Sequence, residues 1–197
     1  MHSALLSAQA SGVIAFGYRD FDAVAATGQF CLIPTVRGDS EFVDLKSLMA
    51  AAKDKPNAIP FGVNLGGNNH MAALALQNSL PGAAFRFVQI GGGAANFAAL
   101  TGGHTKVAVF TGGEYSNYSA SGLKALAYMG EKRLGNLQDL PTSSESGFDV
   151  SYCITNFWFA PKGTSPEAID GFADTLEKVM QTDAMKTSLE TTFTAPV

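Results

Sequence analysis

Three glycine-rich turns follow three consecutive apolar segments in the middle of the chain, and they limit its fold more than any other feature. The first, second and third turns comprise residues 65–70, 91–96 and 111–113. The segments before them, 59–64, 85–90 and 107–110, have the length and composition of strands, and each turn leads into an apolar pattern of helical period. Strands that alternate with helices at this spacing predict βαβ units and a parallel sheet. We therefore expect an α/β fold.

The window that holds these turns is almost without charge. Between Pro56 and Thr105 the only formally charged side chain is Arg86, and 11 of the 21 glycines lie between Gly62 and Gly113. In a parallel sheet the carboxyl ends of the strands lie along one edge, and ligands bind in the crevice there. Each turn also opens a helix, whose first N–H groups lack intrahelical partners and carry partial positive charge. The sequence thus predicts an anion site built without cations.

Other interpretations of the glycine turns are weaker. A single glycine turn would be explained by its place at the end of a strand, but three in a row beside an uncharged stretch favour a binding cleft. A nucleotide site is disfavoured, because Asn96 stands where a G-x-G-x-x-G fingerprint needs its third glycine, and no G-x-x-x-x-G-K-[ST] motif occurs.

His70 and His104 have no ligand partners at metal spacing, so we interpret them as a first-turn polar residue and a helix C-cap.

The sequence contains no motif of covalent catalysis. It has no G-x-S-x-G nucleophile elbow, and neither Cys31 nor Cys153 has a setting that would activate a thiol. Glu114 and Glu131 are isolated carboxylates, which are typical of a solvated surface. We expect no catalytic residue, no metal and no cofactor. Because triads assemble from distant residues, a small α/β enzyme acting on an acyl or phosphorylated metabolite stays the alternative, with a serine, Cys31 or Cys153 as nucleophile.

Charge and hydropathy exclude several partners. The formal net charge is −4 over 197 residues and no basic run occurs, so neither nucleic acid nor a membrane surface is expected as a partner. No stretch of 18 or more apolar residues could span a bilayer, and no Lys or Arg precedes Arg19, so the sequence as given shows no signal peptide. The two cysteines could be free or bridged and do not decide the redox compartment.

The flanking segments indicate a second lobe. Residues 29–36 and 152–159 have strand patterns, and 41–55 reads as a helix. A C-terminal helix begins either with Ser165 as cap and Pro166 at its first position, or with a Thr164/Glu167 capping box. Helical spacing places on one face of each helix Leu45, Leu48, Met49 and Ala52 in 41–55; Met71, Leu74, Ala75 and Asn78 after the first turn; and Ala94, Phe97, Ala98 and Thr101 after the second. Near the C-terminus the expected buried face is Ile169, Phe172, Ala173, Leu176 and Met180.

Seven short motifs together carry a family resemblance. They are the segments 44–48, 64–70, 88–95, 100–104, 123–127, 139–142 and 159–164. In this order they resemble the periplasmic solute-binding receptors of the tripartite tricarboxylate transporter family, also called Bug receptors. The resemblance implies a type II periplasmic-binding-protein-like fold of two α/β lobes with mainly parallel sheets. It also implies that the lobes close around a small carboxylate and deliver it to membrane transporter subunits, and that the protein is periplasmic.

Carried over by position, the resemblance implies ligand contacts from all three turns. They are Gly66, Gly67, Asn68, Asn69 and His70 in the first turn, Gly92, Gly93 and Ala94 in the second, and Thr111 and Gly112 in the third. Family members hold the ligand carboxylate by backbone N–H groups and bound water. This mode of binding agrees with the scarcity of cations in the window.

The sequence departs from the family pattern in two ways. Relatives are longer and begin with a signal peptide and a first-lobe βα segment, so we expect a truncated receptor, with a partial lobe 1 (1–38 and 125–197) and an essentially complete, inserted lobe 2 (39–124). Exposed sheet edges are then expected to lower stability or to lead to self-association through the incomplete lobe. Lys106 stands where relatives usually have an acidic residue, so local packing is expected to differ there. A truncated remnant that binds no ligand is a further alternative.

Overall fold

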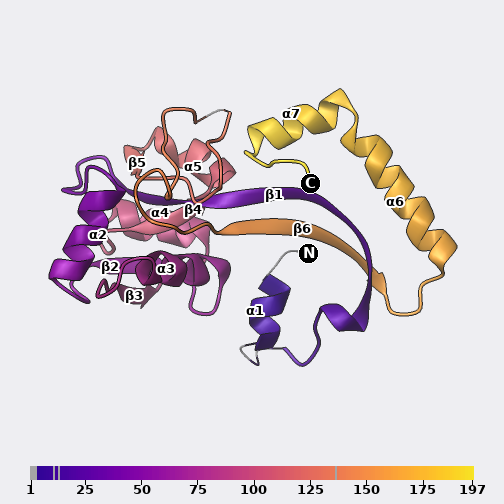
Figure 1. Cartoon of the computed structure of the whole chain (residues 1–197), viewed down its shortest axis with the longest axis horizontal. Coiled ribbons are helices and arrows are strands. Elements are labelled where there is room, and N and C mark those ends of the chain that lie inside the picture. The colour runs from indigo at the N-terminus through magenta and orange to yellow at the C-terminus, as the bar shows by residue number, and fades with distance from the viewer. Residues whose placement is uncertain (1–3, 11, 13, 136) are drawn as a thin grey trace. The chain divides into compact units, whose positions relative to one another are not determined.

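The computed structural model describes residues 4–10, 12, 14–135 and 137–197, and the chain divides into two compact units. Unit 1 comprises Met1–Phe30 and Ile154–Val197, and unit 2 comprises Cys31–Cys153. The divisions fall inside two paired strands, β1 (Phe21–Arg37) and β6 (Cys153–Pro161), which therefore pass from one unit to the other (Figure 1). The lobe limits expected at 38 and 125 stay a prediction.

Unit 2 contains the alternation of strands and helices that the sequence predicts. Its elements after β1 are α2 (Leu45–Asp54), β2 (Pro60–Val63), α3 (Asn68–Asn78), β3 (Arg86–Gln89), α4 (Gly93–Thr101), β4 (Ala108–Thr111), α5 (Gly112–Ser119) and β5 (Leu123–Ala125). β2 and β3 are parallel, with Phe61 opposite Phe87, and Phe61 also forms a parallel bridge with Val107 just before β4. The βαβ prediction is confirmed. β1 adds antiparallel pairings to β4 and β5, so the strands of the unit are mixed in direction.

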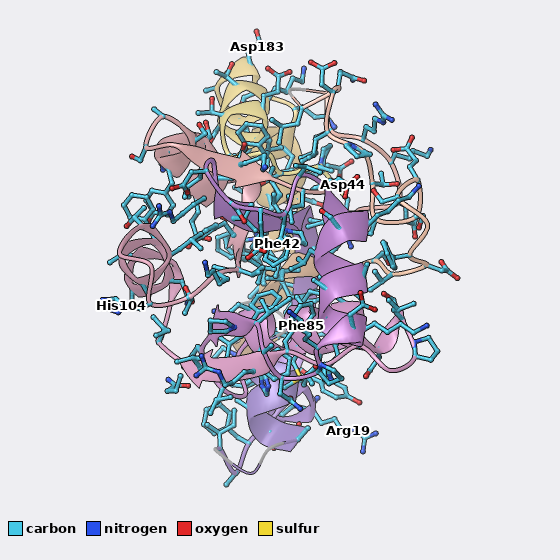
Figure 2. The ribbon with its side chains drawn as sticks, turned by 90° about the vertical axis from the view of Figure 1, so that its left-hand side faces the viewer. Arg19, Phe42, Asp44, Phe85, His104 and Asp183 are labelled. Carbon is cyan, nitrogen blue, oxygen red and sulfur yellow. A yellow bond between two sulfur atoms is a disulfide. The ribbon has the colours of Figure 1, made fainter. Side chains whose placement is uncertain are left out.

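The core of unit 2 is built from buried side chains of its strands and helices, and it includes one face of α2. The predicted face of α2 is confirmed, because Leu45, Leu48, Met49 and Ala52 are all fully buried. Asp44 caps the helix by accepting a hydrogen bond from Ser47 N at 2.7 Å. Figure 2 shows Asp44 at the start of α2 and Phe85 in the interior. Burial of each large apolar side chain contributes roughly 1.5–3 kcal/mol, so this core is the main stabilising feature of the unit.

The faces of α3 and α4 that the residue spacing marks in the sequence are not the faces that these helices bury. α3 buries Ala72, Ala73 and Leu76, and α4 buries Asn96, Ala99 and Leu100. Both helices carry apolar residues on most of their surface. The spacing of apolar residues in the sequence therefore did not indicate which face of each helix is buried. Close approach to the sheet selects it instead: a Cβ atom built on Gly62 of β2 would overlap the Asn96 side chain.

Unit 1 has almost no core of its own among the described residues. It contains α1 (Ala4–Ala10), the 3-10 helix η1 (Tyr18–Asp20), parts of β1 and β6, α6 (Pro166–Met180) and α7 (Asp183–Thr191). Its buried hydrophobic side chains, among those described, are Leu5 and Ile154. Ser165 caps α6 with Pro166 at the first position, which confirms one of the two predicted starts.

The predicted buried face of α6 is wrong. No residue of α6 is buried, and Phe172 is 44% exposed. The apolar residues of α6 do recur with helical spacing. An amphipathic helix, however, buries its apolar face only where another element covers it. The described part of unit 1 supplies too little cover. α7 was not predicted from the sequence.

A disulfide joins Cys31 of β1 to Cys153 of β6, which decides the question that the sequence left open. Both cysteines belong to unit 2, at the residues where the two strands leave it. Among the described helices, none has the length and apolar character needed to cross a membrane.

Candidate functional site

The three glycine turns lie side by side on unit 2. They follow the carboxyl ends of β2, β3 and β4 and lead into α3, α4 and α5. Leu65 N donates to Gln89 Oε1 at 2.6 Å, and Asn69 Nδ2 donates to the Gly91 carbonyl at 3.2 Å. These two hydrogen bonds join the first turn to the second. Ten residues predicted as ligand contacts are thus brought to one edge, although their contact with a ligand stays a prediction.

The first turn is shaped by hydrogen bonds from its own backbone. Gly66 N donates to His70 Nδ1 at 3.1 Å, and Gly67 N donates to the Asn64 carbonyl at 2.8 Å. Gly66 has a φ of +80°, a conformation that favours glycine. Because the N–H groups of Gly66 and Gly67 have partners inside the turn, these glycines fix its shape. The first turn of α3, where Asn69 and His70 lie, is the part of a helix whose N–H groups have no intrahelical partners.

His70 is held as a neutral imidazole. Its Nδ1 accepts the hydrogen bond from Gly66, so in this tautomer the proton lies on Nε2. The ring packs edge-on against Phe87, with 5.0 Å between centroids, and burial lowers the pKa of His70 below its ordinary value. The side chain therefore offers an N–H donor without a formal charge.

The second turn is fixed by a buried amide. Asn96 is fully buried, and its Nδ2 donates to the carbonyls of Gly91 at 2.6 Å and Gly92 at 3.1 Å. Gly92 is the N-cap of α4 and has no side chain with which to cap it. In the sequence, Asn96 served only to reject a nucleotide fingerprint, and its structural role was not predictable because a buried side-chain amide leaves no periodic signal.

The third turn carries a carboxylate that the sequence analysis placed wrongly on the solvated surface. Thr111 N donates to Glu114 Oε2 at 2.9 Å, and Glu114 N donates to Thr111 Oγ1 at 3.1 Å. This reciprocal pair is a capping box at the start of α5, and the T-x-x-E spacing in the sequence could have revealed it. Glu114 is half-buried and also lies against Gly93 of the second turn.

Tyr152 is a further residue of this edge that the sequence analysis did not predict. Its hydroxyl donates to Asn68 Oδ1 at 3.3 Å, and burial raises the pKa of the phenol. Tyr152 precedes Cys153, so the disulfide lies next to a residue that contacts the start of α3.

Two hollows of unit 2 are lined by none of the predicted contacts. One of about 260 Å³ is lined by Arg37, Asp39, Glu41 and Lys106, among others, and another of about 370 Å³ includes Leu137. Within the described residues, no group of three or more His, Cys, Asp or Glu side chains could hold a metal ion.

A family comparison decides which proteins this chain is related to. The model of the tripartite tricarboxylate transporter family receptors matches residues 12–197. The chain belongs to this family of receptors. A comparison with curated proteins found no match.

Solved structures show the same fold as this receptor. The periplasmic binding protein BugD is 21% identical with a TM-score of 0.86, and the alignment covers 100% of this chain and 67% of BugD. A Rhodopseudomonas palustris protein solved with adipate is 21% identical, with a TM-score of 0.81 and coverage of 90% and 60%. MatC from the same organism, with bound malate, is 18% identical, with a TM-score of 0.82 and coverage of 98% and 67%. The type II periplasmic-binding-protein fold is confirmed, and the receptor chain spans 60–67% of the length of these proteins.

Proposed function

We propose that this protein is an extracytoplasmic solute-binding receptor that captures a small organic carboxylate and delivers it to a tripartite tricarboxylate-type membrane transporter. The observation that carries the proposal is the edge of unit 2 where α3, α4 and α5 begin at three adjacent turns, in a chain of this receptor family. Adipate and malate, the ligands of two related structures, are both small carboxylates.

Binding at this edge would rely on neutral donors. A helix N-terminus stabilises a nearby anion by about 0.3–1 kcal/mol when exposed, and by more in a partly buried site. The first N–H groups of α3, the Nε2 proton of His70 and the Asn69 amide supply donors without a cation. These groups recognise the carboxylate, and the rest of the site determines which carboxylate is bound.

The disulfide supports a location outside the cytoplasm. Disulfides form and persist in oxidising compartments such as the periplasm, and they are rare in reducing ones. Cys31 and Cys153 form one here. The bond also weakens the enzyme alternative, because neither sulfur is available as a thiol nucleophile while it is oxidised. We therefore propose a protein that binds and does not turn over its ligand.

Calorimetric titration tests this function. The oxidised protein is titrated with malate, adipate, succinate and the monocarboxylate succinamate, and we expect heat of binding and an increase in Tm for at least one of them. Asn69→Ala should weaken the binding several-fold, whereas Asn117→Ala, at an exposed position of α5, should not. Absence of heat and of a Tm shift with every carboxylate would refute the proposal, and steady product formation from an acyl or phosphate ester would favour the enzyme alternative.

A further inference from the structure

Glu114 is fixed in place by the start of its own helix. Its Oε2 accepts a hydrogen bond from Thr111 N at 2.9 Å, while its backbone N–H donates to Thr111 Oγ1 at 3.1 Å. A side chain tied in this way at the first turn of a helix loses most of its rotamers. The second carboxylate oxygen, Oε1, is therefore held in a defined direction.

That second oxygen lies at the start of α4. A Cβ atom built on Gly93, the first residue of α4, would lie 2.6 Å from Cδ of Glu114 and would overlap Oε1. The space that a side chain at position 93 would fill is thus occupied by the carboxylate. Gly92, the N-cap of α4, contributes no side-chain acceptor of its own. Glu114 consequently supplies negative charge to the N-termini of two helices, α4 and α5.

This placement divides the three turns into two kinds. The first turn carries Asn, Gln and His side chains as its polar partners, with no acidic group among the hydrogen bonds described there. The second and third turns share a carboxylate that belongs to the protein. A carboxylate of the ligand placed at the start of α4 would meet a like charge a few ångströms away, which costs binding free energy in a half-buried site.

We propose that the Glu114 carboxylate supplies the negative charge at the second and third turns, where α4 and α5 begin, and that it thereby determines the charge of the accepted ligand. A ligand carboxylate is directed to the start of α3, and the group facing Glu114 must be a neutral or positively charged hydrogen-bond donor, such as an amide, hydroxyl or ammonium group. The favoured ligands are therefore small monocarboxylates with a donor at the other end rather than di- or tricarboxylates. This specificity rests on the proposed function, whereas the position of Glu114 does not.

Matched pairs of ligands test the specificity. Succinate and its monoamide succinamate have nearly the same size, as do glutarate and glutaramate, and each pair differs in one carboxylate. By calorimetry we expect the wild-type protein to bind the monoamide at least about tenfold more tightly than the diacid. Glu114→Gln should reduce this preference to less than about threefold, because the like charge is removed while an oxygen remains to accept from Thr111 N.

Glu145 provides a matched control. In a turn rather than at the start of a helix, it makes the same reciprocal hydrogen bonds, accepting from Thr142 N at 2.8 Å and donating its N–H to Thr142 Oγ1 at 3.1 Å. It also forms an exposed ion pair with Arg133. Glu145→Gln removes one negative charge from a turn outside the three glycine turns and should leave the ligand preference unchanged. If the wild type binds diacid and monoamide equally, or if both variants change the preference alike, the specificity is refuted while the carboxylate-binding function stands. If no probe binds to the wild type, the proposed function and the specificity both fail.

A double-mutant cycle tests the position of Glu114 without any ligand. Gly93→Ala should destabilise the wild-type protein in urea unfolding, because the new Cβ overlaps the carboxylate. In a Glu114→Ala background the space is vacated, so the same substitution should cost much less. Additive effects of the two substitutions would overturn the placement of Glu114 at the start of α4, whatever the result of the titrations.

Discussion

The hydrogen bond from Gly66 N to His70 Nδ1 makes the stability of unit 2 depend on pH. Burial lowers the pKa of His70 below 6.5 in the folded protein, so the unfolded state binds the proton more readily. The stabilising contribution is complete above about pH 6.5 and is lost as the pH falls through the lower pKa of the folded state. We predict that His70→Gln, which keeps an acceptor for Gly66, flattens this part of the urea-unfolding profile between pH 7.5 and 5. His104→Gln, at an exposed position, should leave it unchanged.

Asn96 is the residue on which the second turn depends. Its amide donates to two backbone carbonyls from a fully buried position. Asn96→Ala removes both side-chain hydrogen bonds, while the Asn69 amide and the backbone N–H of position 96 stay as donors to the two carbonyls. We predict a loss of about 1–3 kcal/mol in the free energy of unfolding. Urea denaturation at pH 7.5 measures this loss. A change below about 0.5 kcal/mol, the range expected for Asn117→Ala on the exposed side of α5, would contradict the role assigned to Asn96.

At the scale of elements, the sequence predicted the order of strands and helices in unit 2 better than the way the helices pack. The face of α2 was predictable because polar and apolar residues separate cleanly around it, and Pro56 follows its end. α3 and α4 lack such a separation, so only contact with the sheet reveals that Ala72 and Asn96 face inward. Glu114 was missed for a related reason, because its contact with Gly93 joins two helices that no local pattern relates.

The start of α2 provides a test at this scale. Asp44 accepts from Ser47 N at 2.7 Å, and this hydrogen bond lowers the pKa of the Asp44 carboxyl. Asp44→Ala should reduce the free energy of unfolding by about 1 kcal/mol, the usual effect of losing an N-cap. Asp54→Ala, at the last residue of the same helix, should have no such cost, because a carboxylate there opposes the helix dipole. Equal losses in the two variants would show that α2 does not depend on its cap.

At the scale of the whole molecule, the two units differ in what stabilises them. Most of the buried hydrophobic side chains belong to unit 2, whereas the described part of unit 1 buries only Leu5 and Ile154. Local opening is easiest where few apolar groups are buried. We predict that hydrogen exchange in α6 and α7 is fast and that in α2 and β4 it is slow. Comparable protection in α6 and α2 would show that unit 1 is covered in solution, for example by a second chain.

The disulfide is the long-range constraint on unit 2. It links residues 122 positions apart, so it restricts the unfolded chain over nearly the whole unit. Loop-closure entropy predicts a stabilisation of about 2–5 kcal/mol, and reduction should lower the urea midpoint accordingly. The double variant Cys31→Ala/Cys153→Ala should resemble the reduced wild type and should not respond to dithiothreitol.

The bond also fixes the residue next to Tyr152, whose hydroxyl donates to Asn68 Oδ1. Reduction should therefore weaken carboxylate binding as well as stability, and a wild-type midpoint that is insensitive to dithiothreitol would contradict a stabilising role for the bond.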